Sequence, residues 1–456
     1  MLTRIDREII ADLYLSRDGL ALVEEIVERF GSRFGGTPQE HQAAEFIREG
    51  FAALDVDRVV LETFTCPGWT RNDTRLAVTA PIQREMDCIA LPYCPPGTVE
   101  GPLVYLGDGD PQTFVVRRDE IRGAIAMATT AAPRFFPRGM HRCEKLGRAL
   151  DAGATGFIWM RGMAGGLPET GSARFGHSCE VPAVSVSYET GHELIRLGKK
   201  GTVRLRLTST NENHPVTSHN VIAEFRGRRK PDEIIVIGAH YDGHDISQSA
   251  MDNATGLAVL MEAARALAPH RDILDRTVRM IAFAQEEMGL HGAHHHAEQH
   301  KGEAIRFMLN LDGTARSMNA SFDLQGWPEA VGFFKKLFDE IFEDDVAVGD
   351  QIGLYADMYA FAARGIPAAT LKSEPVGSSA AASRGYGHTP LDSLDKVTAK
   401  YIQVDAARVA RLAVRLATLD DVPMARKTPA EISAKLRERG LDEVLRLESR
   451  PVPGQG

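Results

Sequence analysis

The fold of this chain is decided by residues 234–243, which read Ile234-Ile235-Val236-Ile237-Gly238-Ala239-His240-Tyr241-Asp242-Gly243. Four consecutive apolar residues predict a buried strand, and the glycine and polar residues after them predict that it ends in a loop. Residues two apart in an extended chain point the same way, so His240 and Asp242 can share a face. The strand is therefore expected to end in side chains capable of chemistry.

Further strands are expected at residues 220–223, 278–283, 307–311 and 367–371. A helix is expected at Gly256 to Ala268, where apolar residues recur on one face. This alternation predicts the α/β class: a mixed sheet, largely parallel at its centre and flanked by helices. In such a sheet, functional residues collect at the carboxyl ends of the parallel strands.

Metal-ligand residue types follow these strands in order: His240, Asp252, Glu287, Asp312 and His388. Nitrogen and carboxylate ligands without a thiolate suit one or two zinc ions, and Co²⁺ or Mn²⁺ would also bind. Asp252 lies in a loop, where its two oxygens can serve two metals. The spacing and placement of these residues predict a metal-dependent hydrolase.

A second glutamate, Glu286, stands directly before Glu287. Adjacent residues on a regular strand face opposite ways, so both reach one site only if the chain turns here. The following Gly289 makes such a turn easy. A free carboxylate beside metal ligands is the group that a hydrolase needs as its general base.

Composition narrows the function further. A net charge of −9 without a basic run argues against nucleic acid as a partner. The five scattered cysteines predict reduced thiols, no apolar run predicts a membrane span, and the N-terminus lacks a signal-peptide core. We therefore expect a cytoplasmic protein. The absence of a Gly-x-Ser-x-Gly elbow argues against a serine hydrolase.

Changes in composition and apolar pattern along the 456 residues predict four regions. Residues 1–79 open the chain with helices that belong with the later α/β region, one beginning at Thr37-Pro38. Residues 80–212 alternate short apolar runs with turns and predict a β-rich domain. Residues 213–420 form the α/β region, and residues 421–456 form a tail whose helix opens with a capping box at Thr428. The tail is a candidate contact in a homo-oligomer.

Other histidines are expected to lie outside the site. His177, near Cys179, is interpreted as structural or incidental. A histidine-rich stretch follows the glutamates and predicts the solvated face of an exposed helix. Its members are His291, His294, His295, His296 and His300.

Several motifs resemble the co-catalytic zinc exopeptidases of metallopeptidase family 28. They are GAHYDG at 238–243, MDNATGLAVLMEAAR at 251–265, FAQEEMGLHGA at 283–293, NLDG at 310–313 and GHTPLD at 387–392. The resemblance covers about residues 214–415 and implies the zinc-exopeptidase fold. EIRGAIAMAT, ALDAGATGFIWM and VPAVSVSYETG, all within 120–191, resemble an inserted protease-associated domain.

The resemblance also implies roles for single residues. His240 and Asp312 would hold one zinc, Glu287 and His388 a second, and Asp252 would bridge the two. Glu286 would be the general base acting on a bridging water, and Asp242 would orient His240. The family further implies a cis peptide between Asp252 and Asn253.

The chain departs from the family pattern near the expected substrate pocket. Ala356-Asp357-Met358 stands where the family usually has Ser-Asp-His, and Ala293 replaces a small hydroxyl residue. Tyr355 and Tyr386 can each be an oxyanion donor or a buried structural tyrosine. The role of Asp357 is left open.

The resemblance favours an aminopeptidase acting on short peptides. A carboxypeptidase or dipeptidase would need a basic pocket for a free carboxylate, for which Arg364 and Arg384 are candidates. A glutaminyl cyclase is disfavoured because that branch works with one zinc and His240 is present. A non-catalytic binding protein on this fold is disfavoured because every ligand and the base are retained.

Overall fold

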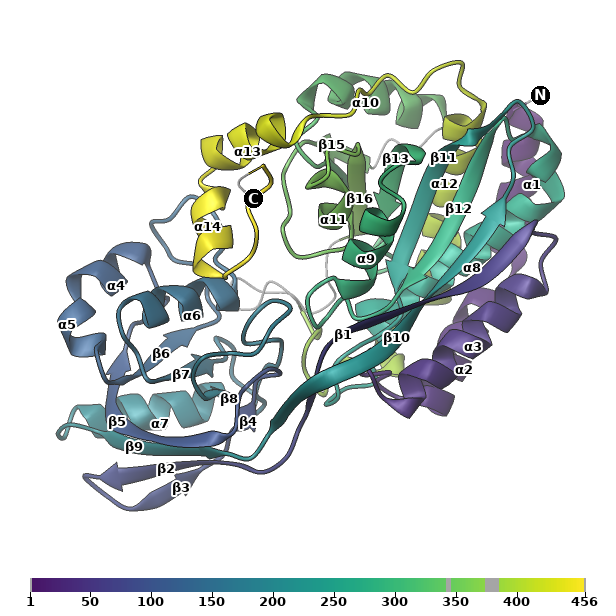
Figure 1. Ribbon diagram of the computed structural model, residues 1–456. Coiled ribbons are helices and arrows are strands. Elements are labelled where there is room, and N and C mark those ends of the chain that lie inside the picture. Colours follow the sequence, from purple (N-terminus) through teal and green to yellow (C-terminus); the bar gives the residue numbers. More distant parts are fainter. Residues whose placement is uncertain (1, 342–345, 374–384, 455–456) are drawn as a thin grey trace.

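The computed structural model describes residues 2–341, 346–373 and 385–454. Two eight-stranded sheets dominate it, and Figure 1 shows them as two parts joined by a pair of long strands. Among the described residues, no helix combines the length and apolar character needed to cross a bilayer. The site described below lies at one edge of the larger sheet.

The larger sheet has a parallel centre and antiparallel flanks. Its strands, in spatial order, are β1 (Arg58–Thr70), β10 (Glu212–Phe225), β12 (Arg276–Phe283), β11 (Lys230–His240), β13 (Ala304–Asn310), β16 (Ala368–Ser373), β14 (Ala320–Leu324) and β15 (Val346–Gly349). Strands β12, β11, β13 and β16 run parallel, whereas β10 and β14 pair antiparallel at their outer sides. The predicted mixed sheet with a parallel centre is confirmed.

Helices cover both faces of this sheet. Five helices pack against one another in one layer over the sheet: α1 (Leu2–Leu15), α2 (Asp18–Phe30), α3 (Pro38–Ala52), α8 (Thr255–Leu267) and α12 (Ala399–Thr418). A second set comprises α9 (His291–Gln299), α10 (Val331–Glu340) and α11 (Met358–Ala362). Helix α8 is buried almost throughout, which explains why its sequence is apolar beyond a single stripe. The predicted start of α3 is confirmed, because Thr37 caps it ahead of Pro38.

The smaller sheet is inserted between two strands of the larger one. Strands β1 and β10 pair along their whole lengths, and the chain between them forms the second sheet (Figure 1). Its strands, in spatial order, are β3 (Arg84–Met86), β2 (Thr74–Ala80), β9 (Arg204–Ser209), β5 (Gly97–Tyr105), β6 (Ile125–Thr129), β7 (Gly156–Met160), β8 (Ala183–Val186) and β4 (Ile89–Ala90). We call residues 71–211 the insertion.

Helices also cover the smaller sheet on both sides. One core lies under α4 (Pro111–Val116), α5 (Arg118–Ile121) and α6 (Arg142–Asp151), and the other under α7 (Tyr188–Gly198). Strand β6 serves both cores because alternate residues face opposite ways. The insertion begins its sheet at Thr74, earlier than the start at residue 80 that the composition suggests.

The C-terminal tail contains two helices rather than the single one expected from sequence. They are α13 (Pro429–Glu438), which opens with the predicted capping box, and α14 (Leu441–Leu447). Helix α14 packs against α6 of the insertion. The carbonyl of Leu447 accepts a hydrogen bond from Arg174 at 2.6 Å. The tail therefore ties the insertion to the rest of the chain.

Candidate metal centre

The expected residues meet at the carboxyl edge of the parallel strands. His240 ends β11, Glu286 and Glu287 follow β12, and Asp312 follows β13. Asp252 lies in η1 (Ala250–Ala254), the irregular turn that opens α8. His388 lies in the chain beyond β16. One pocket is lined by His141, Arg142, Phe175, Asp252, Glu286, Glu287, Asp312, Tyr355 and His388.

Two groups of ligand atoms face each other across Asp252. Its Oδ1 lies 3.5 Å from Nε2 of His240, and its Oδ2 lies 3.5 Å from Nε2 of His388. The peptide between Asp252 and Asn253 is cis, as the resemblance implied. Because each oxygen faces a different histidine, the carboxylate stands where it can serve two metals.

The first group consists of His240, Asp252 and Asp312. Oδ1 of Asp312 lies 4.0 Å from Nε2 of His240. Nδ1 of His240 donates a hydrogen bond to the backbone carbonyl of Asp242 at 3.1 Å. This bond leaves the Nε2 lone pair pointing toward the two carboxylates.

The second group contains Glu287 and His388 together with His244, which the sequence did not single out. Oε2 of Glu287 lies 2.8 Å from Nε2 of His244 and 3.2 Å from Nε2 of His388. The two imidazole rings lie edge to face, with centroids 4.2 Å apart. One sequence signal could have found His244: it is a histidine, a metal-ligand residue type, and it follows His240 by four positions.

Asp242 acts differently from the expected arrangement. Its carboxylate lies 3.6 Å from Nδ1 of His240, and the backbone carbonyl takes the ring hydrogen bond instead. The carboxylate accepts the backbone N–H groups of Glu286 at 3.1 Å and Glu287 at 3.2 Å. Asp242 therefore holds the turn that carries both glutamates.

That turn needs left-handed backbone at two positions. Gln285 has φ 62° and Gly289 has φ 130°. A side chain on Gly289 would meet the backbone of Gly176 in the insertion, so only glycine fits there. The predicted turn is thus observed, and it brings the two adjacent glutamates into one pocket.

The two glutamates have opposite electrostatic surroundings. Burial raises the pKa of Glu286 well above its ordinary value, and the adjacent carboxylate of Glu287 adds to this. Burial alone would also raise the pKa of Glu287, but His244 and His388 hold it well below its ordinary value. Glu286 is therefore the more basic of the pair.

Backbone groups and buried side chains position the ligands. His388 donates from Nδ1 to the carbonyl of Thr170 at 3.2 Å and accepts the Thr170 N–H through its own carbonyl at 2.9 Å. Asp392 accepts the N–H groups of Met251 at 2.6 Å and Asp252 at 3.0 Å. Thr170 belongs to the insertion, and no local sequence pattern linked the insertion to the site. Asp392 lies within GHTPLD, but its role could not be read from that motif.

Arginine also supports the loops. The buried Arg33, between α2 and α3, donates to the carbonyls of Tyr241 at 2.7 Å and Ser249 at 2.9 Å. It therefore ties together the segments that carry His240 and Asp252. Burial lowers the pKa of Arg33 to about 10, so the side chain stays charged near neutral pH.

The two tyrosines considered as oxyanion donors lie in different surroundings. Tyr355 lines the pocket, but its hydroxyl donates to Glu448 at 2.6 Å and its ring stacks on His141. Tyr386 is not among the lining residues, and Lys396 lies over its ring. Both tyrosines therefore fit a structural role better than that of an oxyanion donor.

Neither of the two arginines suggested by the sequence is seen to form a basic pocket for a substrate carboxylate. Arg364 donates to Glu298 and to the carbonyl of Ala360, away from the lining residues, and Arg384 lies outside the described residues. Arg142 of α6 lines the pocket instead. Arg142 was missed because it comes from the insertion.

The Ala356-Asp357-Met358 departure lies within the buried core. Asp357 is fully buried, and burial raises its pKa well above the ordinary value. The sulfur of Met358 accepts a hydrogen bond from the side-chain amide of Asn310 at 3.7 Å. Ala293 is buried in α9. None of the three lines the pocket.

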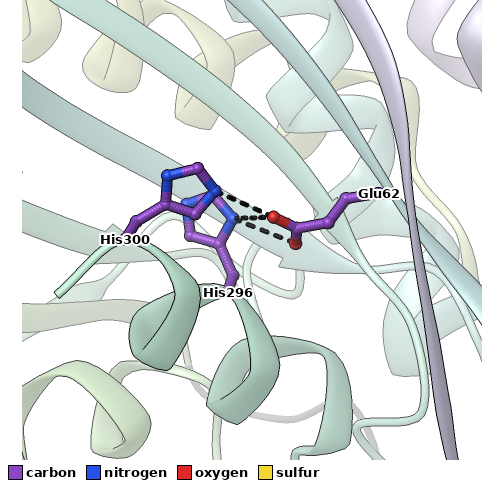
Figure 2. A group of neighbouring side chains, drawn as sticks. All are labelled: Glu62, His296 and His300. Atoms are coloured by element: carbon purple, nitrogen blue, oxygen red, sulfur yellow. Dashed lines mark hydrogen bonds and ion pairs between the residues drawn. The ribbon is translucent and has the colours of Figure 1, made fainter.

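The histidine-rich helix is not a solvated face, and that prediction was wrong. Helix α9 packs against β1 and β10, so His296 is fully buried and the other four histidines are partly buried. His296 and His300 converge on Glu62 of β1 (Figure 2). The reason is a long-range partner: a carboxylate on β1 satisfies histidines that local sequence would leave to water.

The donor set fits zinc. In a tetrahedral site, zinc bonds of about 2.0–2.2 Å place neighbouring ligand atoms about 3.3–3.6 Å apart. The N···O separations across the two groups run from 2.8 Å to 4.0 Å and so lie on both sides of this spacing. Among the described residues, Oε1 of Glu287 and both ring nitrogens of His244 are buried without a hydrogen-bond partner. Buried ligand atoms with free lone pairs are what a bound cation would satisfy.

The sheet and its ligand groups define a metal-dependent hydrolase. Residues 220–413 match the family model described as Peptidase family M28. This part of the chain therefore belongs to peptidase family M28, and the protein is a metallo-exopeptidase.

Curated relatives of two kinds resemble the chain. Carboxypeptidase Q of Mus musculus is 21% identical over 406 residues, which cover 87% of this chain and 85% of the mouse protein. Aminopeptidase YwaD of Bacillus subtilis is 26% identical over 311 residues, which cover 66% of this chain and 63% of that protein. The chain thus spans less than two thirds of the Bacillus relative.

Solved structures share the fold. A peptidase M28 precursor from Shewanella amazonensis has a TM-score of 0.76 at 24% identity, covering 93% of this chain and 99% of its own. A zinc aminopeptidase from Bacillus subtilis has a TM-score of 0.65 at 23% identity, covering 86% of this chain and 93% of its own. The likeness extends over both sheets of the present fold.

Proposed function

We propose that the chain is a two-zinc aminopeptidase that removes N-terminal residues from short peptides. One geometric observation supports it most strongly. Two ligand groups share Asp252, and Glu286 lies in the same pocket on a turn held by Asp242. A base held beside paired metal positions is the arrangement that metal-assisted hydrolysis requires.

The ligands divide between two positions. His240 and Asp312 would hold one zinc, Glu287 and His388 the other, and Asp252 would serve both. Zinc bound at this site would polarise the scissile carbonyl and stabilise negative charge on its oxygen.

Glu286 performs the proton transfers in this proposal. Its carboxylate takes a proton from the attacking water and later delivers it to the leaving amine. Asp242 keeps Glu286 in place by accepting its backbone N–H, and the burial of Glu286 keeps its carboxylate basic. Glu287 stays ionised beside its histidines and does not compete for that proton.

One relative favours an aminopeptidase over the other exopeptidases. Aminopeptidase YwaD, which covers 66% of this chain, carries that name. Of the four carboxylates that line the pocket, Asp252, Glu287 and Asp312 are assigned to the metals, which leaves Glu286 to face the substrate.

A carboxypeptidase or dipeptidase is the second candidate, favoured by Arg142. Its side chain lines the same pocket, and a guanidinium is suited to binding the carboxylate of a peptide C-terminus. The mouse relative named carboxypeptidase Q also aligns over 87% of the chain. Replacing Arg142 would then raise KM for substrates with a free carboxylate.

The insertion would shape the pocket rather than perform chemistry. We propose that it is a protease-associated domain, because it supplies His141, Arg142 and Phe175 to the lining without a catalytic cluster of its own. A cytoplasmic location is also proposed, since all five cysteines are unpaired. Imaging of a tagged chain in its own cell would test the location.

Metal content and a substrate panel test the function together. Purified protein is expected to hold two zinc ions per chain and to cleave aminoacyl substrates and free-amine dipeptides. Removal of the metal with a chelator should abolish cleavage, and added zinc should restore it. Cleavage restricted to N-blocked dipeptides would replace the aminopeptidase with a carboxypeptidase. No metal and no hydrolysis would contradict the proposal as a whole.

A further inference from the structure

We propose that His244 is a metal ligand, giving the Glu287–His388 position four protein ligands against three at the other position. The inference rests on the proposed function, because it requires that metal be held at this site. His244 lies in the loop after β11 and is 1% exposed. Its Nε2 comes within 2.8 Å of Oε2 of Glu287.

The distances place His244 in the same ligand group as two expected ligands. One ligand atom from each of His244, Glu287 and His388 lies within 4.8 Å of the others, and all three residues are buried. Oδ2 of Asp252 completes the group at 3.5 Å from His388. Of the separations of 2.8, 3.2 and 3.5 Å, the last two lie close to the spacing of about 3.3–3.6 Å expected between ligands of one tetrahedral zinc ion, and the first is shorter.

A simple ion pair with Glu287 explains His244 less well. The 2.8 Å contact does not make a hydrogen bond, since both ring nitrogens lack such a partner among the described residues. An imidazolium would therefore bury two N–H groups without acceptors. A neutral ring that binds metal through Nε2 would leave only one buried N–H without an acceptor, and each such group is unfavourable to bury.

The other histidine cluster supplies a contrast within the same chain. Glu62, His296 and His300 also lie within 4.8 Å of one another. Nδ1 of His296 contacts Glu62 at 3.1 Å (Figure 2). Its Nε2 accepts a hydrogen bond from the guanidinium of Arg279 at 3.3 Å. A ring whose Nε2 accepts from arginine carries its proton on Nδ1, so that nitrogen donates to Glu62 instead of binding metal.

Unequal ligand numbers imply unequal metal positions. Four protein ligands close a tetrahedral zinc site, whereas three leave a place for a further ligand. The His240–Asp312 position is then the open one, and the Glu287–His388 position is the closed one. The closed position should fill first and resist chelation longest.

Stepwise chelation of the zinc-loaded protein tests this. Wild type, His244→Gln and His296→Gln are dialysed against rising EDTA, and zinc per chain is measured at each step. Wild type and His296→Gln should lose their ions in two steps. In His244→Gln the later ion should leave at no more than about one tenth of the wild-type EDTA concentration, because even the loss of a residue supporting a ligand costs 10–100-fold.

Two further measurements separate ligation from packing. His244→Leu fills the space with an apolar side chain, so it should lose zinc as His244→Gln does even where its metal-free form is more stable. In the cobalt-loaded protein, both variants should change the visible absorption, which depends on ligand type and geometry. Circular dichroism confirms that the metal-free variants fold.

The outcomes are distinguishable. Wild type with two ions and variants with the same EDTA resistance and cobalt spectrum would overturn the role of His244 alone. Wild type that takes up no zinc would overturn the proposed function and this inference together. Loss of the later zinc ion at lower EDTA in the two His244 variants, with wild-type retention of zinc in His296→Gln, would support the inference.

Discussion

Two clusters of histidine and glutamate in this molecule have the same residue types but different hydrogen bonding. Glu62, His296 and His300 join β1 to α9 (Figure 2), whereas Glu287, His244 and His388 lie at the carboxyl edge of the sheet. In each, ligand atoms gather within 4.8 Å. Proximity of ligand types therefore does not distinguish the two.

Hydrogen bonding does distinguish them. Around Glu62, His300 contacts Glu62 at 2.9 Å and Glu303 at 3.0 Å, and Asn220 donates to Glu62 at 2.8 Å. Around Glu287, the described residues leave an oxygen and two ring nitrogens without hydrogen bonds. The first cluster is complete as a hydrogen-bond network, while the second has buried polar atoms that a bound cation would satisfy. Unsatisfied buried lone pairs, rather than residue types, thus mark the metal centre.

The largest difference should appear between Glu286, beside the second cluster, and Glu62 in the first, when each side chain is changed to its amide. Glu286→Gln removes the base and should lower kcat about 10²–10⁴-fold, the usual contribution of a general base. Zinc content should stay unchanged, because Glu286 is not among the ligands. Glu62→Gln, the same chemical change in the other cluster, should leave kcat within about twofold. Steady-state kinetics on an aminoacyl substrate measures both.

A Glu286→Gln variant with near wild-type kcat would remove Glu286 from the mechanism. Equal losses in both variants would mean that the fold, and not the base, limits activity.

A smaller effect is expected at Asp242, which supports the ligands without belonging to either group. Asp242→Asn keeps one acceptor oxygen but turns an amide toward the N–H donors of Glu286 and Glu287. The displaced turn should weaken zinc binding and lower kcat, each about 10–100-fold. Chelator competition and kinetics measure the two effects. Zinc affinity equal to wild type would show that the turn holds without the Asp242 carboxylate.

The sequence predicted the sheet and the strand-end residues because both depend on local chemistry. An apolar run followed by His240 shows a buried strand and the polar residue that ends it. Long-range partners were not predictable in this way. His296 was misread because Glu62, its partner, lies 234 positions away on β1. Thr170 was missed because its bonds to His388 are made by its backbone, which no residue pattern specifies.

The Glu62 cluster should affect stability in a pH-dependent way. Although burial raises it, the hydrogen bonds of His296 and His300 hold the pKa of Glu62 below its ordinary value. Hydrogen bonding to Glu62 raises the pKa of His300. The contribution of Glu62 is lost as pH falls below its ordinary range, and that of His300 is lost as pH rises through its raised value.

Glu62→Gln should therefore destabilise the fold most between about pH 5 and pH 6.5, by about 1–3 kcal/mol. The loss should shrink as the pH rises and His300 loses its proton. Urea denaturation of the variant and wild type across this range measures the difference. A penalty that grows toward pH 9 would contradict the ion-pair description.

The smallest effect is expected at Thr170, although it touches a ligand of the metal centre. Its N–H and carbonyl, not its side chain, bond to His388, and its Oγ1 is buried without a hydrogen-bond partner among the described residues. Thr170→Val keeps the β-branched shape and removes an unsatisfied hydroxyl, so stability should rise by no more than about 1 kcal/mol. Zinc content and kcat should match wild type. A tenfold loss of either would show that His388 depends on the Thr170 side chain, as His296 depends on that of Glu62. Backbone anchoring would instead explain how the insertion can orient a ligand through a residue of almost any type.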